Sequence, residues 1–411
     1  MLRRLLPIII FVIGADIVSI QAATNIFGSS TLLYGIWTGA TVLVLASLFL
    51  YFSREMRKRS GIARPVLMST FFMLLFPKVI VSVLLLIEDV VRLTKLMANG
   101  VITALGSDFN FGLGRSFWWD AFALSFALLL TLAFVYGAIF NVYRYQIRKV
   151  KVKLVKLPKA FDGLRVVQIS DIHSGSLSNR EAVAKAVDRI NSLSPDLIFF
   201  TGDLVNNIAE EARGFVDIFA KLQAKHGVYS ILGNHDYGDY MAWPDEATKQ
   251  HNLETLKTMH AQMGWRLLLN EHVHIERSGN KIAVAGVENW SARGRFKSYG
   301  RLEQTLHGIQ DAMTVLLLSH DPSHWEGEVL DHPAKVDITF SGHTHGMQFG
   351  LDLPWFKWSP VKYLYRQWAG LYQQNDQYLY VNRGFGVIGY PGRVGILPEI
   401  TLFTLQTTQS E

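Results

Sequence analysis

Four long apolar stretches in the first 140 residues constrain this chain of 411 residues more than any other feature of its sequence. They span about residues 5–23, 31–52, 65–87 and 117–140. A helix needs about 20 mostly apolar residues to cross the hydrocarbon core of a bilayer. We therefore predict an α-helical four-span transmembrane domain within residues 1–142. The first stretch could instead be a signal peptide, because two arginines precede it, but its length and the second stretch nearby favour a span.

The basic residues predict how these spans are oriented. In a four-span arrangement one side of the membrane receives Arg3, Arg4, Arg54, Arg57, Lys58, Arg59, Arg64, Arg144, Arg148, Lys149, Lys151, Lys153 and Lys156. By the positive-inside rule that side is the cytoplasm. We expect an integral protein of a bacterial inner (plasma) membrane, with both termini and the C-terminal domain cytoplasmic. The net charge of +6 is then a topology signal, with inner-leaflet lipids rather than nucleic acid as the expected partner.

Two ionisable residues interrupt the apolar stretches. Asp16 and Lys78 fall at similar depth in the first and third predicted spans. Charged groups in hydrocarbon usually face a partner or a cavity, so we hypothesise that they pair. The alternative is that helix packing accommodates each one separately.

The remainder of the chain has the pattern of a layered α/β domain. Short β-branched runs, LRVVQIS, DLIFFTG, GVYSILG, KIAVAGV, TVLLLSH, VDITFSG and QYLYVNRG, are predicted strands. Helical patterns fall at residues 179–193, 209–225, 246–263 and 301–312. Apolar strands between helices are typical of a sheet buried on both faces. We predict a catalytic domain over residues 161–408, joined to the spans by a basic juxtamembrane linker at 143–160.

Polar side chains cluster where the predicted strands end, which is where ligands gather in such folds. They are Asp171, His173, Asp203, Asn234, His235, His320, His343 and His345, and five of the 13 histidines are among them. There is no cysteine, so thiolate ligands are excluded. Imidazoles with carboxylates suit Mn, Fe or Zn. Two such ions about 3.5–4 Å apart can activate a bridging water and hold a phosphate for displacement. The residues therefore predict phosphoryl transfer.

The order of these residues resembles the motifs of the calcineurin-like metallophosphoesterase superfamily. The matching motifs are DIH at 171–173, GD at 202–203, GNHD at 233–236, SHDP at 319–322 and GHTHG at 342–346. The ending, NRGFG and then LPEITLFTL, resembles a membrane-anchored bacterial branch. The resemblance implies a four-layer α/β/β/α sandwich that holds two divalent ions.

The resemblance also implies a role for each residue. Asp171, His173 and His345 would bind the first ion, and Asn234, His320 and His343 the second. Asp203 would bridge the two ions. His235 would lie beside the scissile phosphate as a general acid or as a stabiliser of the leaving oxygen.

Two positions depart from the family pattern. Asn206 stands where many relatives have an acidic residue that orients the catalytic histidine, which puts the activation of His235 in question. Met347 stands where the nearest branch often has glycine, which changes the wall of the site.

These features predict a metal-dependent phosphoric ester hydrolase, a phosphodiesterase or pyrophosphatase that uses a metal-bridging hydroxide on a lipid-linked or membrane-proximal phosphate. The alternatives are a catalytically impaired membrane sensor or scaffold, and a metal-dependent nuclease.

Arg383 and Arg393 are candidates for phosphate contact by position alone. The aromatic and basic stretch at 354–372 is either a membrane-facing lip or a loop packed on its own domain. The sequence does not predict the oligomeric state or the physiological substrate.

Overall fold

The computed structural model describes residues 2–53, 63–294 and 296–408. The chain forms two compact units, an N-terminal one that reaches Tyr136 and a C-terminal one that begins at Gly137. Of the basic residues that predict the topology, Arg54, Arg57, Lys58 and Arg59 lie outside the described residues.

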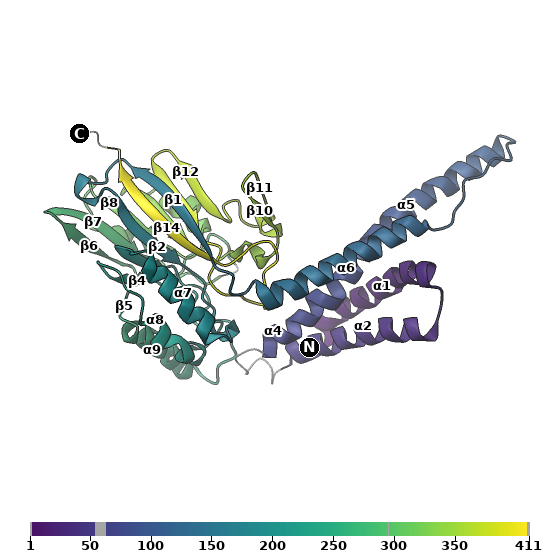
Figure 1. The fold of residues 1–411 in the computed structure, drawn as a ribbon, viewed down its shortest axis with the longest axis horizontal. Helices are drawn as coiled ribbons and strands as arrows, with labels where there is room; N and C mark the ends of the chain where they lie inside the picture. Colours follow the sequence, from purple (N-terminus) through teal and green to yellow (C-terminus); the bar gives the residue numbers. More distant parts are fainter. Residues whose placement is uncertain (1, 54–62, 295, 409–411) are drawn as a thin grey trace. The chain divides into compact units, whose positions relative to one another are not determined.

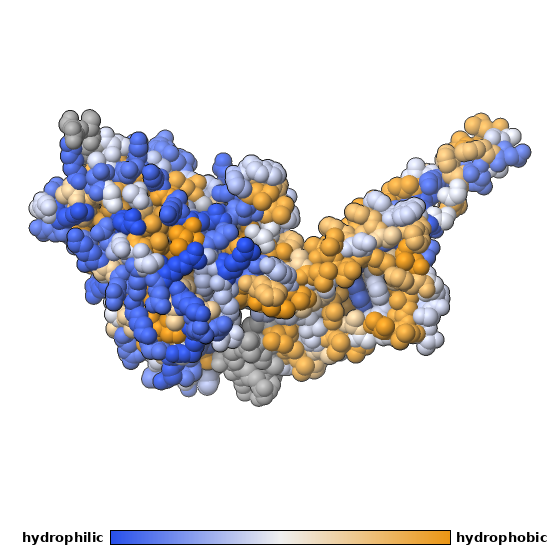
Figure 2. Space-filling view, in the orientation of Figure 1, coloured by the Kyte–Doolittle hydropathy of each residue, from blue (hydrophilic) through white to orange (hydrophobic). Residues whose placement is uncertain are grey.

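The N-terminal unit is helical. Its helices are α1 (Leu2–Phe27), α2 (Thr31–Tyr51), α4 (Ala63–Thr70), a π-helical turn (Phe71–Leu75), α5 (Phe76–Ala104) and α6 (Phe117–Phe140), the last of which ends in the C-terminal unit. Among the residues that the structure describes, four segments are long and apolar enough to span a membrane, which confirms the predicted number. Their surface is mainly apolar (Figure 2).

The helix that contains the third predicted span continues beyond the predicted end of that span. It runs over Val66–Ala104, 39 residues, rather than ending near residue 87. The two acidic residues that follow this predicted end are paired with a basic residue. Glu88 and Asp89 lie 3.1 Å and 2.8 Å from the Arg115 guanidinium, which precedes α6.

The predicted pairing of Asp16 with Lys78 is confirmed. Lys78 Nζ lies 2.5 Å from Asp16 Oδ1 and donates to Thr41 Oγ1 and to the Trp37 carbonyl, each at 2.8 Å. Thus α1, α2 and α5 meet at one cluster of polar side chains centred on Lys78.

The C-terminal unit contains two six-stranded mixed sheets (Figure 1). The first has the order β1 (Gln146–Leu154), β14 (Glu399–Thr407), β2 (Leu164–Ile169), β3 (Leu197–Phe200), β4 (Val228–Ser230) and β5 (Trp265–Leu267). The second has the order β12 (Gly370–Gln374), β13 (Gln377–Val381), β9 (Ile338–Ser341), β8 (Thr314–Leu318), β7 (Asn280–Gly286) and β6 (Glu271–Arg277). All seven strands predicted from the β-branched runs are present.

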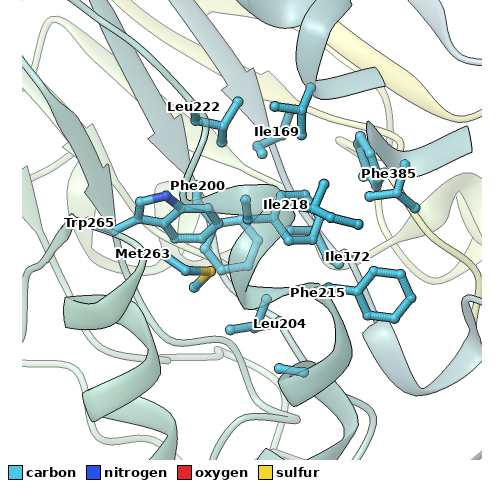
Figure 3. Close-up of a cluster of buried hydrophobic side chains, with 14 of the residues drawn as sticks. Ile169, Ile172, Phe200, Leu204, Phe215, Ile218, Leu222, Met263, Trp265 and Phe385 are labelled. Carbon is cyan, nitrogen blue, oxygen red and sulfur yellow. The ribbon is translucent and has the colours of Figure 1, made fainter. Parts of the chain in front are cut away.

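Three apolar cores hold these layers together. One, which includes Phe199 and Phe340, joins the facing sides of the two sheets. A second packs α7 (Arg180–Ser192), α8 (Val216–Phe219) and α9 (Glu246–Gln262) onto the first sheet through residues such as Phe200 and Trp265 (Figure 3). A third packs α10 (Leu302–Leu306) and a π-helical turn (Trp325–Val329) onto the second sheet. The arrangement is the predicted four-layer α/β/β/α sandwich.

The basic segment at 143–160 is not a linker along its whole length. Residues 146–154 form β1, an edge strand paired in parallel with β14. Val152 and Leu154 are buried between the sheets, while Lys149, Lys151 and Lys153 alternate with them and are exposed. Alternating lysines are a common way to protect an edge strand from further pairing, which explains why this strand has the composition of a linker.

Candidate metal centre

The strand ends of both sheets bring the predicted site residues together. Asp171 and His173 follow β2, Asp203 follows β3, and Asn234 and His235 follow β4. From the second sheet, His320 follows β8, and His343 and His345 follow β9. Residues that lie up to 172 positions apart in sequence are therefore within hydrogen-bonding distance.

Asp171, His173 and His345 form a first buried group of potential ligands. His345 Nε2 lies 3.0 Å from His173 Nε2 and 3.2 Å from Asp171 Oδ1. Two imidazole nitrogens this close together are favourable when they share a proton or a cation. This spacing fits a divalent ion.

A second group contains Asp203, His320 and His343, with Asn234 beside them. Asn234 Oδ1 lies 2.8 Å from His343 Nδ1 and 3.2 Å from His320 Nε2. Asp203 Oδ2 lies 3.1 Å from His320 Nε2 and 3.5 Å from His173 Nε2, so this carboxylate stands between the two groups. The Asp203 carboxylate is thus the only predicted ligand within reach of both among the described residues.

Partners behind the ligands turn the correct atoms toward the centre. His320 Nδ1 donates to the Thr201 carbonyl at 2.7 Å, which leaves Nε2 with its lone pair on the ligand side. Asn234 Nδ2 donates to the Tyr240 hydroxyl at 2.9 Å, which leaves Oδ1 facing the histidines. Outer partners of this kind fix tautomer and orientation in metal sites. The donor set therefore fits two divalent ions.

Tyr365 and Asp321 contribute to the site, although the motif reasoning gave them no role. The Tyr365 hydroxyl donates to Asp321 Oδ2 at 3.3 Å and lies 2.9 Å from His343 Nε2. A hydroxyl that donates to the carboxylate can accept from Nε2–H, which leaves His343 Nδ1 for an ion. Asp321 belongs to the SHDP motif and Tyr365 to the aromatic stretch, so both stood in segments that were already marked by sequence.

His235 is oriented by the backbone of Asn206 rather than by its side chain. His235 Nδ1 donates to the Asn206 carbonyl at 2.6 Å, while the Asn206 amide donates to Ser176 Oγ at 2.9 Å. The carbonyl contact fixes the His235 ring with Nε2 available. The amide in place of an acidic side chain therefore does not remove the orienting hydrogen bond.

The ligand-bearing turns have unusual backbone conformations. Five of the predicted ligands, none of them glycine, have positive φ: Asp171, His173, Asp203, His343 and His345, with values from 46° to 69°. Such conformations cost of order 1 kcal/mol or more each and cluster at functional sites. Asp236 holds two of these turns together, because its carboxylate accepts from the backbone N–H groups of Asp203, Leu204 and Gly233.

Burial and neighbouring charge set the protonation of these groups. Burial lowers the pKa of His173 well below its usual value. Burial raises the pKa of Asp203, but the nearby His320 and His235 outweigh it and hold the pKa well below the usual range. Burial lowers the pKa of His320, yet the Asp203 carboxylate raises it overall to about 10. Asp203 and His173 are thus in the forms that bind a cation, whereas an ion at His320 must displace a proton.

The two arginines predicted to contact phosphate are buried and already occupied. Arg383 is ion-paired with Glu399 at 2.6 Å and with Asp352 at 2.9 Å. Arg393 donates to the carbonyls of Arg383 and Gly386, and its Nη2 lies 3.3 Å from His345 Nδ1. Both guanidinium groups are buried and are bound to carboxylates or carbonyls of the turns around the site. Neither is therefore accessible to a substrate.

The aromatic stretch at 354–372 divides into two parts. Tyr365 and Trp368 are buried, and Trp368 contributes its carbonyl to Thr344 Oγ1 at 2.7 Å, beside the ligands. Trp355 and Tyr363 are 81% and 73% exposed. One part of the stretch therefore packs on its own domain, whereas the other is exposed, and a membrane-facing role of the exposed part stays a prediction.

Two family models match the chain. The model described as calcineurin-like phosphoesterase matches residues 164–347, and the one described as probable calcineurin-like phosphoesterase, transmembrane domain, matches residues 2–142. Together they cover both units of the structure.

The curated relatives are named as metallophosphoesterases or as a pyrophosphatase. "Uncharacterized metallophosphoesterase YkuE" of Bacillus subtilis is 31% identical over 62% of this chain and 84% of that protein. "Transmembrane protein with metallophosphoesterase domain" of Danio rerio is 30% identical over 68% of this chain and 62% of that protein, so the chain spans less than two thirds of the latter. "UDP-2,3-diacylglucosamine pyrophosphatase LpxG" of Chlamydia muridarum is 29% identical over 56% of this chain and 81% of that protein. The chain therefore belongs to the calcineurin-like metallophosphoesterase family.

Proposed function

We propose that the chain is a dimetal phosphodiesterase or pyrophosphatase that acts on a lipid-linked or membrane-proximal phosphate. The observation that carries the proposal is the position of Asp203, whose Oδ2 lies within 3.5 Å of a histidine from each ligand group. Asp171, His173 and His345 would hold one ion, and Asn234, His320 and His343 the other. The ions would be Mn, Fe or Zn, because the donors are imidazoles and oxygens.

Ions bound in this pair would supply an activated water and would neutralise charge on the phosphate oxygens. Side chains of the protein would supply the proton and orient the ligands. The Asn206 carbonyl holds Nδ1–H of His235, so Nε2 would be the atom that delivers a proton to the leaving oxygen or stabilises its charge. Tyr240 and Tyr365 would keep Asn234 and His343 turned toward the ions.

The membrane unit supports a substrate at the bilayer surface. The Chlamydia muridarum relative is named as a pyrophosphatase of UDP-2,3-diacylglucosamine, a nucleotide joined to an acylated sugar. A related activated or lipid-linked phosphate is the substrate class that we propose. We also propose a bacterial inner membrane location with the catalytic unit in the cytoplasm, on the strength of the basic residues that flank the spans.

The test is hydrolysis of bis(p-nitrophenyl) phosphate by the full chain in detergent with added Mn²⁺. Asn234→Ala and His235→Ala should each lower kcat by about 100-fold or more. Asn206→Ala should retain activity within a few-fold, because its carbonyl remains in place. His274→Ala, an exposed position on β6, is the matched control for loss of an imidazole.

Metal analysis separates the alternatives. The His235→Ala protein should keep two equivalents of metal, because His235 is not in either ligand group. Two bound equivalents in the unmodified chain without turnover of any phosphoester would instead indicate a sensor or scaffold. Turnover of DNA or RNA in preference to other diesters would indicate a nuclease.

A further inference from the structure

A two-stranded hairpin stands apart from both sheets, at the edge of the catalytic unit (Figure 1). It consists of β10 (Leu351–Leu353) and β11 (Phe356–Trp358), joined by Pro354 and Trp355. The pairing places Leu351 opposite Trp358 and Leu353 opposite Phe356, while Asp352 lies opposite Lys357. Because opposed residues share a face and successive residues alternate, the hairpin has one apolar face and one charged face.

The charged face fixes the hairpin to the catalytic unit. The Asp352 carboxylate is 3% exposed and is ion-paired with Arg383 at 2.9 Å and with Arg148 of β1. Arg383 in turn binds Glu399 at the start of β14. The hairpin therefore has a defined orientation, set by buried charges, rather than the freedom of a loose loop.

Within the described part of the chain, the apolar face has no comparable cover. Leu351 is 50% exposed, Phe356 is 44% exposed, and Trp355 at the turn is 81% exposed. In the space-filling view, apolar residues gather where Figure 1 places β10 and β11 (Figure 2). Exposure of adjacent Leu, Trp and Phe side chains on a fixed hairpin marks an interaction surface.

The root of the hairpin lies beside the end of the last membrane helix. Val394 donates to the Gln348 carbonyl at 2.7 Å and accepts from Gly350 N–H at 2.9 Å, just before β10 begins. Its neighbour Arg393 donates from its backbone to the Gly137 carbonyl in the final turn of α6 at 3.2 Å. Adjacent hydrogen-bonded segments are about 5 Å apart, so the hairpin root is about 10 Å from this turn.

That final turn is itself apolar and exposed. Ile139 and Phe140 are 62% and 60% exposed, although they are part of the same unit as the catalytic sheets. A helix that crosses a bilayer leaves it where its apolar residues end. The exposed face of the hairpin is therefore rooted next to the end of the apolar helix α6, which favours lipid as its cover.

We propose that the β10–β11 hairpin inserts its apolar face into the boundary between headgroups and acyl chains of the membrane that α6 spans. Trp and Phe are favoured at this depth, and exposed basic residues of the same unit, Arg144, Lys149 and Lys151, suit anionic headgroups. The hairpin begins six residues after His345, so insertion holds the candidate metal centre close to the lipid surface. This surface does not depend on the hydrolytic activity proposed above.

The absence of cysteine from the sequence allows a direct test with the full chain. A spin label is attached to Trp355→Cys or, as a control, to Val155→Cys, and each protein is placed in nanodiscs of phosphatidylcholine and phosphatidylglycerol. Val155 is a matched exposed apolar position at 52%, but it follows the far end of β1, nine residues of strand away from α6. Collision of the label with oxygen and with a water-soluble nickel chelate is measured by power saturation.

Insertion predicts that the label at position 355 collides more with oxygen and at least several-fold less with nickel than the label at position 155. Equal collision with nickel at the two positions would overturn the proposal. Protection from nickel without a gain in oxygen collision, together with spin–spin broadening, would mean that a second copy of the chain covers the hairpin, and would also overturn it. Retained metal content in both labelled proteins verifies that the fold is intact.

Discussion

At the scale of single residues, the site depends on backbone conformations that most side chains avoid. His343 and His345 both have positive φ, and Gly342 precedes them without side-chain bulk. A Cβ at Gly342 would overlap the Asp171 carboxylate and the Ser170 hydroxyl. The GHTHG turn therefore needs glycine for contact with the β2 turn, and the pair of histidines one residue apart can then serve different ligand groups.

Gly342→Ala should disrupt the first ligand group. We expect metal content to fall from two equivalents to one or none and kcat to fall at least 100-fold, because Asp171 must move away from the new methyl group. Gly214→Ala is the control, since the nearest atom to a Cβ there is 3.9 Å away, on Arg180. Two equivalents of metal and near-normal turnover in the Gly342→Ala protein would show that the turn can relax, contrary to this account.

At the scale of elements, α9 is held to the first sheet by a histidine that the site does not use. His260 Nδ1 lies 2.9 Å from Ser230 Oγ of β4, and its ring contacts Trp265 at a centroid distance of 5.6 Å. Burial lowers the pKa of His260 to about 3. The folded protein therefore keeps His260 neutral throughout the mildly acidic range.

This burial predicts a loss of stability in acid. An unfolded chain protonates His260 at about pH 6.5, whereas the folded chain does not until about pH 3. Between these values the unfolded state binds more protons, so the free energy of unfolding falls as the pH falls, by up to about 1.4 kcal/mol per pH unit. The contribution is complete above pH 6.5.

The measurement is the thermal unfolding midpoint in detergent from pH 7.5 to pH 5. His260→Gln should unfold at a lower midpoint at pH 7.5, but the gap from the unmodified chain should narrow toward pH 5. His251→Gln, an exposed position on the same helix, should track the unmodified chain. A gap that stays constant with pH would mean that His260 does not couple folding to protonation.

At the scale of the whole molecule, the catalytic unit, which water surrounds, and the membrane unit, which lipid surrounds, are stabilised by different interactions. The catalytic unit has extensive apolar cores between and outside its sheets. The membrane unit has small apolar clusters within its helices and several ion pairs, among which Asp16 with Lys78 joins α1 to α5. In hydrocarbon, removal of one partner leaves an uncompensated charge, which costs several kcal/mol.

Exchange of the two charges tests this contact. Asp16→Ala and Lys78→Ala should each reduce the amount of folded protein recovered from membranes, whereas Asp16→Lys combined with Lys78→Asp should restore much of it. The readout is monodisperse protein by fluorescence-detected size exclusion. Arg92→Ala is the control, because its pair with Asp89 is more than one-third exposed on the Asp89 side. Failure of the exchange to restore recovery would argue that the geometry of Thr41 and Trp37 around Lys78, rather than charge pairing, is what matters.

Sequence by itself determined the membrane spans, seven of the eight inner strands of the two sheets and the candidate ligands, because each depends on local composition or on a spaced motif. Long apolar runs and β-branched runs are local properties, and strand ends predict where side chains converge. The edge strand β1 was assigned to a linker because its lysines resemble those of a solvated segment. The continuation of the third helix past residue 87 was not predicted, and Glu88 and Asp89 there have their partner, Arg115, 26 or more residues away.

Only the tertiary structure decided which atoms meet. It showed that Asn206 orients His235 through its carbonyl, that Tyr365 and Asp321 stand behind His343, and that Arg383 and Arg393 are enclosed. It also divided the aromatic stretch into a buried part and an exposed hairpin. The physical reason is that motif and periodicity report what a side chain is and where it falls along a strand. Its hydrogen-bond partners and its exposure are set by segments that are distant in sequence.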